Sequence, residues 1–206
     1  MIPSIQQAET YLREGFWQNQ GLWADHSRYV GQAARLIAER VSGLDPDRAQ
    51  VLGMLHDIGR RFGITENLHI IDGYDFMMRQ GFPDVARICL THSFPLQDIE
   101  SCFGSWQPRK SLKRDGEAEK QRVAALLSEV TYDEYDRLIQ LCDALATSKG
   151  FCLMEKRWVN VVMRYGPNPY MVPKWKATYK IKEHFEKQMR VSVYEILPGV
   201  KENTFA

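Results

Sequence analysis

The helical periodicity of the apolar residues constrains this 206-residue chain more than any other feature. Apolar residues recur at spacings of three and four along nearly the whole sequence, and alternating apolar–polar runs are almost absent. This spacing places apolar side chains on one face of a helix, whereas strict alternation is typical of half-buried strands. The length suits one sizeable core. The sequence therefore predicts an all-α fold, a single-domain helical bundle spanning residues 1–206.

Caps, glycines and prolines divide the pattern into segments. We expect helices over about 4–18, 25–41, 45–59, 68–80, 83–94, 118–128, 133–148, 151–164 and 174–189. Asp25 is the expected N-cap of the second helix, and Asp45-Pro46 opens the third. Residues 94–117 break the periodicity with two prolines and two glycines, and we expect a long loop there. The tail 191–200 is expected to form a short strand or an extended segment.

Charge and cysteine content exclude several classes of protein. The 27 basic and 26 acidic residues leave a net charge of +1, which argues against extended nucleic acid or an anionic membrane as the main partner. The four cysteines form no CxxC pair, so neither a zinc ribbon nor a redox motif is predicted. The chain shows no secretory signal and no apolar run long enough to span a membrane. We expect a cytoplasmic protein with free thiols.

Most of the histidines lie on helix faces that are predicted to point inward. Four of the five share an apolar stripe with their neighbours in sequence: His26, His56, His69 and His92. Only His184 falls in a charged segment.

Two aspartates, Asp57 and Asp143, are expected to lie among the inward-facing histidines. A buried carboxylate requires a cation or strong hydrogen bonds, and mixed imidazole and carboxylate groups are ligands that first-row divalent metals accept. The alternative is that each histidine is a hydrogen-bonded core residue, that Asp57 caps a turn and that Asp143 pairs with an arginine.

Several segments that carry these residues resemble the HD-domain superfamily of metal-dependent phosphohydrolases. The matching stretches occur in the family's order: DHSRYVGQAARLIA, LGMLHDIGRRFG and LCDALAT. Two more, LHIIDGYDFMMRQGFP and ARICLTHSF, resemble the segments of a subset that holds a second metal. The resemblance covers about residues 20–150, which would form an HD-type metal-binding core. Residues 151–206 would be a C-terminal helical extension packed on that core.

The sequence also departs from the family's pattern. Arg60 follows His56-Asp57-Ile58-Gly59 where many relatives have lysine, and Ile70 rather than proline follows His69. The Gly-Tyr-Pro signature of cyclic-di-GMP phosphodiesterases is missing, which argues against that substrate.

The resemblance implies a particular set of ligands. Carried over position by position, His26, His56, Asp57 and Asp143 would hold a first metal. His69 and His92 would hold a second, with Asp57 bridging the two ions. The ions would be one or two divalent transition metals, with iron, manganese, cobalt, nickel and zinc all open, and magnesium is the alternative outside that class. Asp57 and Arg60 are the expected catalytic residues.

The same resemblance implies hydrolysis of a phosphoester or phosphoanhydride by a metal-activated hydroxide. The expected substrate is a nucleotide or a similar small phosphorylated metabolite, and Arg60, Arg61 and Lys149 are candidates for binding it. The basic run PRKSLKR at 108–114 and the nearby Trp106 could form a lid. A catalytically silent, metal-bound nucleotide-binding or sensor module is the alternative function, and a helical interaction protein without metal is a third. Trp158, Tyr165, Tyr170 and Trp175 are expected to pack the C-terminal helices onto the core.

Overall fold

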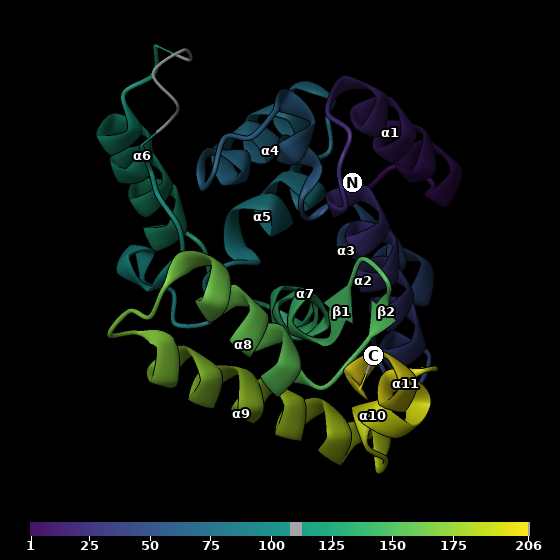
Figure 1. Ribbon diagram of the computed structural model, residues 1–206. Helices are drawn as coiled ribbons and strands as arrows, with labels where there is room; N and C mark the ends of the chain where they lie inside the picture. Colours follow the sequence, from purple (N-terminus) through teal and green to yellow (C-terminus); the bar gives the residue numbers. More distant parts are fainter. Residues whose placement is uncertain (108–112, 206) are drawn as a thin grey trace.

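The computed structural model of the protein describes residues 1–107 and 113–205 and confirms the all-α prediction. Its helices, labelled in Figure 1, are α1 (Ile5–Gln18), α2 (Trp23–Ala38), α3 (Pro46–Leu55), α4 (Leu68–Arg79), α5 (Pro83–Thr91), α6 (Gly116–Ser128), α7 (Glu134–Leu145), α8 (Met154–Tyr165), α9 (Met171–Met189), α10 (Val193–Ile196) and α11 (Val200–Phe205). Short 3-10 helices cover Ile58–Phe62 (η1) and Ile99–Ser101 (η2), and a two-stranded antiparallel ladder joins β1 (Ala146–Thr147) to β2 (Gly150–Phe151).

The helix starts show how the sequence determines these boundaries. The Asp45 side chain accepts hydrogen bonds from the backbone N–H groups of Asp47 and Arg48, with Pro46 in the first turn, as predicted. Asp25 is not an N-cap: α2 begins two residues earlier, at Trp23, and Asp25 lies in its first turn. An acidic residue there still complements the positive end of the helix dipole.

Two expectations about the C-terminal part were wrong. The helix expected to reach residue 148 ends at Leu145, because Ala146 is extended and Gly150 adopts φ +136° to turn the β1–β2 ladder. The tail forms α10 and α11 instead of a strand. Ser192 caps α10 by accepting a hydrogen bond from the Tyr194 N–H group. Four- to six-residue helices are too short to show a clear period in sequence.

Two glycines allow α2 and α3 to approach closely at the centre of the molecule. A Cβ atom on Gly53 would lie 2.7 Å from the Cα of Gly31, and one on Gly31 would lie 2.8 Å from the backbone oxygen of Gln50. Only residues without a side chain fit at that crossing. The tight packing sets the separation of the two helices, which carry His26 in the first turns of α2 and His56 at the end of α3.

Helices α8 and α9 lie against α7, whereas α10 contacts α2 and α11 contacts β2. Figure 1 shows α8 and α9 side by side below α7, and α10 and α11 close to β2. The expected loop after α5 is largely irregular where the structure describes it, at 94–107 and 113–115, with only η2 inside it. Residues 108–112 of the basic run lie outside the described part of the chain, so the lid hypothesis stays a prediction.

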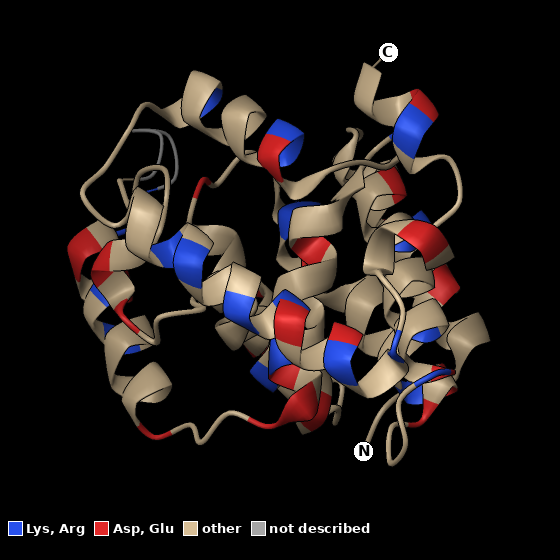
Figure 2. Ribbon diagram, turned by 90° about the horizontal axis from the view of Figure 1, so that it is seen from below, with Lys and Arg blue, Asp and Glu red and all other residues tan. Residues whose placement is uncertain are grey.

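Basic and acidic residues are intermixed in the structure, in keeping with the net charge of +1 (Figure 2). In the view of Figure 2, basic and acidic residues both occur along the helices of the face that is seen. Among the described helices, none has the length and apolar character needed to cross a membrane.

Candidate metal centre

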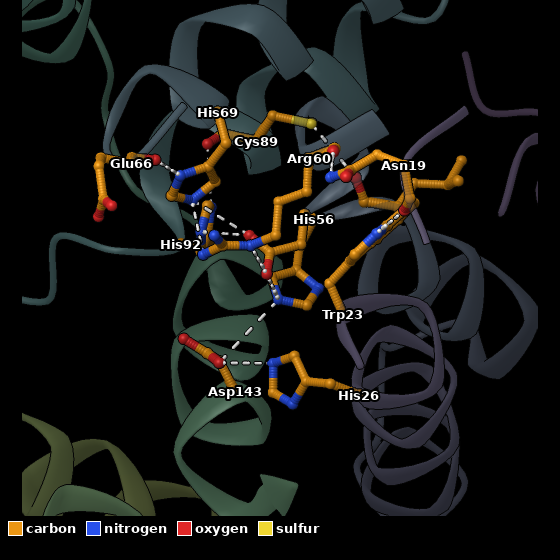
Figure 3. Close-up of polar contacts among 12 residues, drawn as sticks. Asn19, Trp23, His26, His56, Arg60, Glu66, His69, Cys89, His92 and Asp143 are labelled. Atoms are coloured by element: carbon orange, nitrogen blue, oxygen red, sulfur yellow. Dashed lines mark hydrogen bonds and ion pairs between the residues drawn. The ribbon is translucent and has the colours of Figure 1, made fainter. Parts of the chain in front are cut away.

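The six predicted metal ligands come together from five helical segments of the structure (Figure 3). They are His26 on α2, His56 at the end of α3, Asp57 directly after it, His69 in the first turn of α4, His92 just after α5 and Asp143 near the end of α7. Five are buried, with exposed fractions of 7% or less, and Asp143 is partly exposed. The sequence therefore identified a cluster whose members are up to 117 positions apart.

One side of the cluster joins α2, α3 and α7. His26 Nε2 lies 3.0 Å from Asp143 Oδ1, and His56 Nε2 lies 4.0 Å from the same oxygen. His56 Nε2 is also 3.8 Å from Asp57 Oδ2. Ligand atoms of His26, His56 and Asp57 all lie within 4.8 Å of one another, a spacing that one metal ion could bridge. A cation replacing the proton between His26 and Asp143 would contact both groups.

The other side of the cluster joins Asp57 to α4 and α5. His69 Nε2 lies 3.1 Å from Asp57 Oδ1, and His92 Nε2 lies 3.6 Å from that oxygen. These three residues form a second group within the same 4.8 Å limit. Asp57 is the residue that both groups share. One of its oxygens is directed to each side, so the geometry is compatible with two ions bridged by one carboxylate.

Backbone carbonyls hold three of the imidazole rings in place. The Nδ1–H group of His56 donates to the Gly53 carbonyl at 2.7 Å. The Nδ1–H group of His69 donates to the Glu66 carbonyl at 2.5 Å, and that of His92 donates to the Cys89 carbonyl at 2.9 Å. This pattern selects the tautomer whose Nε2 carries a lone pair, which is how proteins commonly orient histidine ligands. In all three residues that lone pair is directed into the cluster.

A second close approach positions His69 beside Asp57. A Cβ atom on Gly59 would lie 1.9 Å from the His69 carbonyl oxygen and 2.5 Å from the Gly73 nitrogen. Glycine at position 59 therefore allows η1 and α4 to touch through their backbones. Asp57 precedes η1 and His69 begins α4, so this contact sets their separation.

Two buried acceptors in the cluster lack hydrogen-bond partners in the described part of the chain. They are His56 Nε2 and Asp57 Oδ1. An unpaired buried polar atom costs about 1–3 kcal/mol. The Nε2 lone pair of His69 also faces Asp57 Oδ1 at 3.1 Å, which brings two acceptors together. A cation between such atoms removes both penalties, so these residues fit a metal ion.

The ionisation states at neutral pH suit metal binding. Burial would raise the pKa of Asp57, but its neighbours, above all the guanidinium of Arg60, outweigh burial and hold that pKa well below its usual value. The pKa of Asp143 is likewise lowered, because His26 and Arg157 outweigh burial. Burial lowers the pKa of His92 to about 3. Ionised carboxylates and neutral imidazoles are the forms that coordinate metals.

Of the three predicted substrate-binding cations, only Arg60 lies in the cluster. Its Nε donates to Asp57 Oδ2 at 2.6 Å, and its Nη2 is 3.3 Å from His69 Nε2.

Arg61 lies outside the cluster. Its guanidinium donates to Gln18 Oε1 and lies 4.1 Å from the centre of the Phe76 ring, in contacts with α1 and α4. Successive residues of a helical turn diverge by roughly 100–120°, so neighbouring side chains cannot face the same site. Lys149 is exposed in the β1–β2 turn and does not line the cavities described below.

Two cavities adjoin the cluster. The inner pocket, of about 130 Å³, lies beside His69, His92 and Asp143 of the cluster, and Arg157, Lys174 and Cys102 also line it. The outer cleft, of about 1260 Å³, is open and is bordered by α2, η1 and α8, with His26, Asp57, Arg60, Arg157 and Tyr165 among its lining residues. Arg60, Glu66, Arg157, Val161 and Tyr165 border both.

The sequence missed the contribution of α8 and α9 to this site. Trp158 and Trp175 do pack, stacked at 5.3 Å between ring centres, but they also line the inner pocket. Arg157 and Lys174 line it too, and neither stood out from the many other cations of these helices. Only spacing along α8 could have indicated that Arg157, Val161 and Tyr165 share one face.

Comparison with known proteins agrees with this geometry. The family model described as the HD domain matches residues 23–148, which contain all six clustered residues. The protein belongs to the HD-domain family, whose members are metal-dependent phosphohydrolases. The helices α8 to α11 follow the matched region.

A curated relative has a narrower match. The protein is 39% identical over 87 residues to "Ribonuclease Y 2" of Bdellovibrio bacteriovorus. The match covers 41% of this chain and 16% of that relative, so the two share only a segment of the longer protein. No solved structure gave a significant match.

Proposed function

We propose that this protein is a metal-dependent phosphohydrolase that cleaves a phosphoester or phosphoanhydride bond in a nucleotide or a similar small phosphorylated metabolite. The observation that carries the proposal is Asp57, a buried carboxylate that two histidine groups share and whose Oδ1 has no hydrogen-bond partner among the described residues. His69, His92 and Asp143 of the same cluster border a pocket that also contains cationic side chains.

In this proposal the clustered residues have distinct roles. His26, His56, Asp57 and Asp143 would hold one divalent ion, and Asp57, His69 and His92 a second. When bound, such ions would polarise phosphoryl oxygens and lower the pKa of bound water toward about 7. Arg60, held by Asp57 and His69, would orient a phosphate oxygen through its remaining N–H groups.

The cavities support a small substrate. The inner pocket is smaller than the roughly 300–1000 Å³ typical of sites for whole drug-sized ligands, whereas the outer cleft exceeds that range. The phosphoryl group of a nucleotide would fit in the inner pocket, and the rest of the nucleotide would fit in the outer cleft. The ribonuclease relative makes a short oligoribonucleotide worth including in any substrate screen.

Metal content and turnover, measured on the same preparation, test the proposal. The full-length protein would be loaded separately with manganese, iron, cobalt and zinc. It would then be incubated with nucleoside monophosphates, a dinucleoside polyphosphate, a cyclic nucleotide and a short oligoribonucleotide. We expect hydrolysis of at least one nucleotide, and a loss of at least about 1,000-fold in Asp57→Asn. His184→Ala, on an exposed part of α9, is the matched control and should keep full activity.

Two other outcomes have definite meanings. Bound metal and nucleotide with no hydrolysis under any loading would contradict the enzyme proposal and support a silent binding or sensor module. Protein purified without chelator that contains no metal, and takes none up, would exclude both readings and leave a helical interaction protein.

A further inference from the structure

The inner pocket contains a cation that no carboxylate neutralises. Lys174, on α9, donates from Nζ to the Ser93 carbonyl at 2.8 Å, and its ammonium lies 5.2 Å from the centre of the Phe103 ring. No Asp or Glu of the described chain comes within 4.0 Å of it. An ammonium has three N–H donors, and one hydrogen bond accounts for only one of them. Ser93 directly follows His92, so Lys174 lies next to the candidate metal centre.

A second cation approaches the same pocket from α8. Arg157 Nη2 lies 3.6 Å from Asp143 Oδ1, which is too long for a hydrogen bond. Its Nε is buried and has no hydrogen-bond partner within the described residues. Arg157 and Lys174 therefore retain unused donors. Both belong to helices beyond residues 23–148, the region that the family model matches.

The unused donors of Lys174 and Arg157 favour an anionic group in the pocket. Of the three cations that line it, Arg60 is paired with Asp57 and Arg157 faces Asp143, and Glu66 also borders the pocket, so Lys174 is the one cation of the three without a carboxylate within 4.0 Å among the described residues. Burial lowers the pKa of Lys174, and an anion beside its ammonium would offset that cost. A terminal phosphate carries about −1.5 to −2 charges near neutral pH, whereas an internal phosphodiester carries a single charge. The small volume also suits a terminal group better than a continuous chain.

We propose that Lys174 and Arg157 bind a terminal phosphate in the inner pocket and make the protein selective for phosphomonoesters over internal phosphodiesters. This selectivity rests on the proposed phosphohydrolase function, although phosphate binding itself does not. The specificity is then supplied by α8 and α9 rather than by the region shared with the family. The rest of the substrate would extend from the pocket into the outer cleft, past Arg60 and Tyr165.

Binding of inorganic phosphate tests the pocket without turnover. Isothermal titration calorimetry would compare the unsubstituted protein, Lys174→Gln and Arg157→Gln with Lys176→Gln, an exposed position on the same helix. We expect Kd to rise about tenfold or more in the first two variants, because each loses a charged hydrogen bond. Lys176→Gln should stay within about twofold. Metal content and the circular-dichroism melting curve show whether each variant remains folded; if one does not, the other still gives the answer.

Selectivity is tested with p-nitrophenyl phosphate and bis(p-nitrophenyl) phosphate. The unsubstituted protein should prefer the monoester, and Lys174→Gln should reduce that preference at least about tenfold, mainly through a higher KM for the monoester. Equal phosphate Kd values in Lys174→Gln, Arg157→Gln and Lys176→Gln would overturn the proposal, as would a preference for the diester. Normal phosphate binding without any hydrolysis would instead contradict the phosphohydrolase function and leave the anion site standing.

Discussion

At the scale of single residues, Asp57 determines what the cluster can do. Its Oδ2 accepts a hydrogen bond from Arg60, and its Oδ1 faces the Nε2 atoms of His69 and His92. A carboxylate in this position cannot be paired by the imidazoles alone, because their Nδ1–H groups are already donated to the backbone. Substitution of single histidines can therefore test whether each histidine group binds its own ion.

Comparison of His26→Ala with His69→Ala separates a one-metal from a two-metal site. Each histidine belongs to one group only, so each variant should lose about one metal equivalent while the other group keeps its ligands. Elemental analysis of the purified variants measures this loss directly, with His184→Ala as the control. Full metal content and activity in His69→Ala would show that the second site does not exist.

At the scale of elements, close backbone contacts position the ligands. The α2–α3 crossing at Gly31 and Gly53 brings His26 and His56 to a ring-centre distance of 5.3 Å. The contact of η1 with α4 at Gly59 does the same for Asp57 and His69. The geometry of the cluster thus depends on glycines that have no chemical role in it.

Gly59→Ala should disturb the second histidine group specifically. The added Cβ would meet the His69 carbonyl at 1.9 Å, so η1 and α4 must move apart. We expect a loss of stability of about 3 kcal/mol, at the upper end for overpacking, together with reduced metal content. Urea denaturation and elemental analysis measure the two effects.

Gly81→Ala is the control for that substitution. Its Cβ would meet nothing within 4 Å, and the cost at φ +79° should be about 1 kcal/mol, with metal content unchanged. If both variants are equally stable and hold equal metal, the η1–α4 contact does not position the site.

At the scale of the whole molecule, the described residues form two hydrophobic core clusters, and burial extends to the cysteines. Cys89, Cys142 and Cys152 are completely buried, and Cys102 borders the inner pocket. All four are free thiols, as the sequence predicted. Burial raises the pKa of each of them, because a thiolate is poorly solvated in the interior.

Thiol labelling reports on this burial. Between pH 7 and 9 the native protein should react with a thiol reagent at one cysteine at most, because raised pKa values leave almost no thiolate and three side chains are inaccessible. All four should react in guanidinium chloride, where thiol pKa values return to about 8.5. Cys102→Ser should remove any native reaction. Rapid labelling of two or more native thiols would contradict the packing described here.

The sequence by itself determined the helical class and the identity of the cluster. A period of three to four residues shows which face of each helix is buried, and polar residues on such a face require partners. That reasoning identifies the inward-facing His26, His56, His69, His92 and Asp143 from the sequence alone. It also predicted the Asp45 cap, because an N-cap depends only on its local neighbours.

Only the tertiary structure decided how the pocket is completed. Periodicity does not state which helices meet, so it could not show that α8 and α9 bring Arg157 and Lys174 to His92 and Asp143. Nor could it separate Arg60 from Arg61, whose directions depend on the 3-10 turn of η1. Local sequence patterns determine the contacts of a residue with its neighbours along the chain. The contacts between distant segments follow from the packing of the whole core.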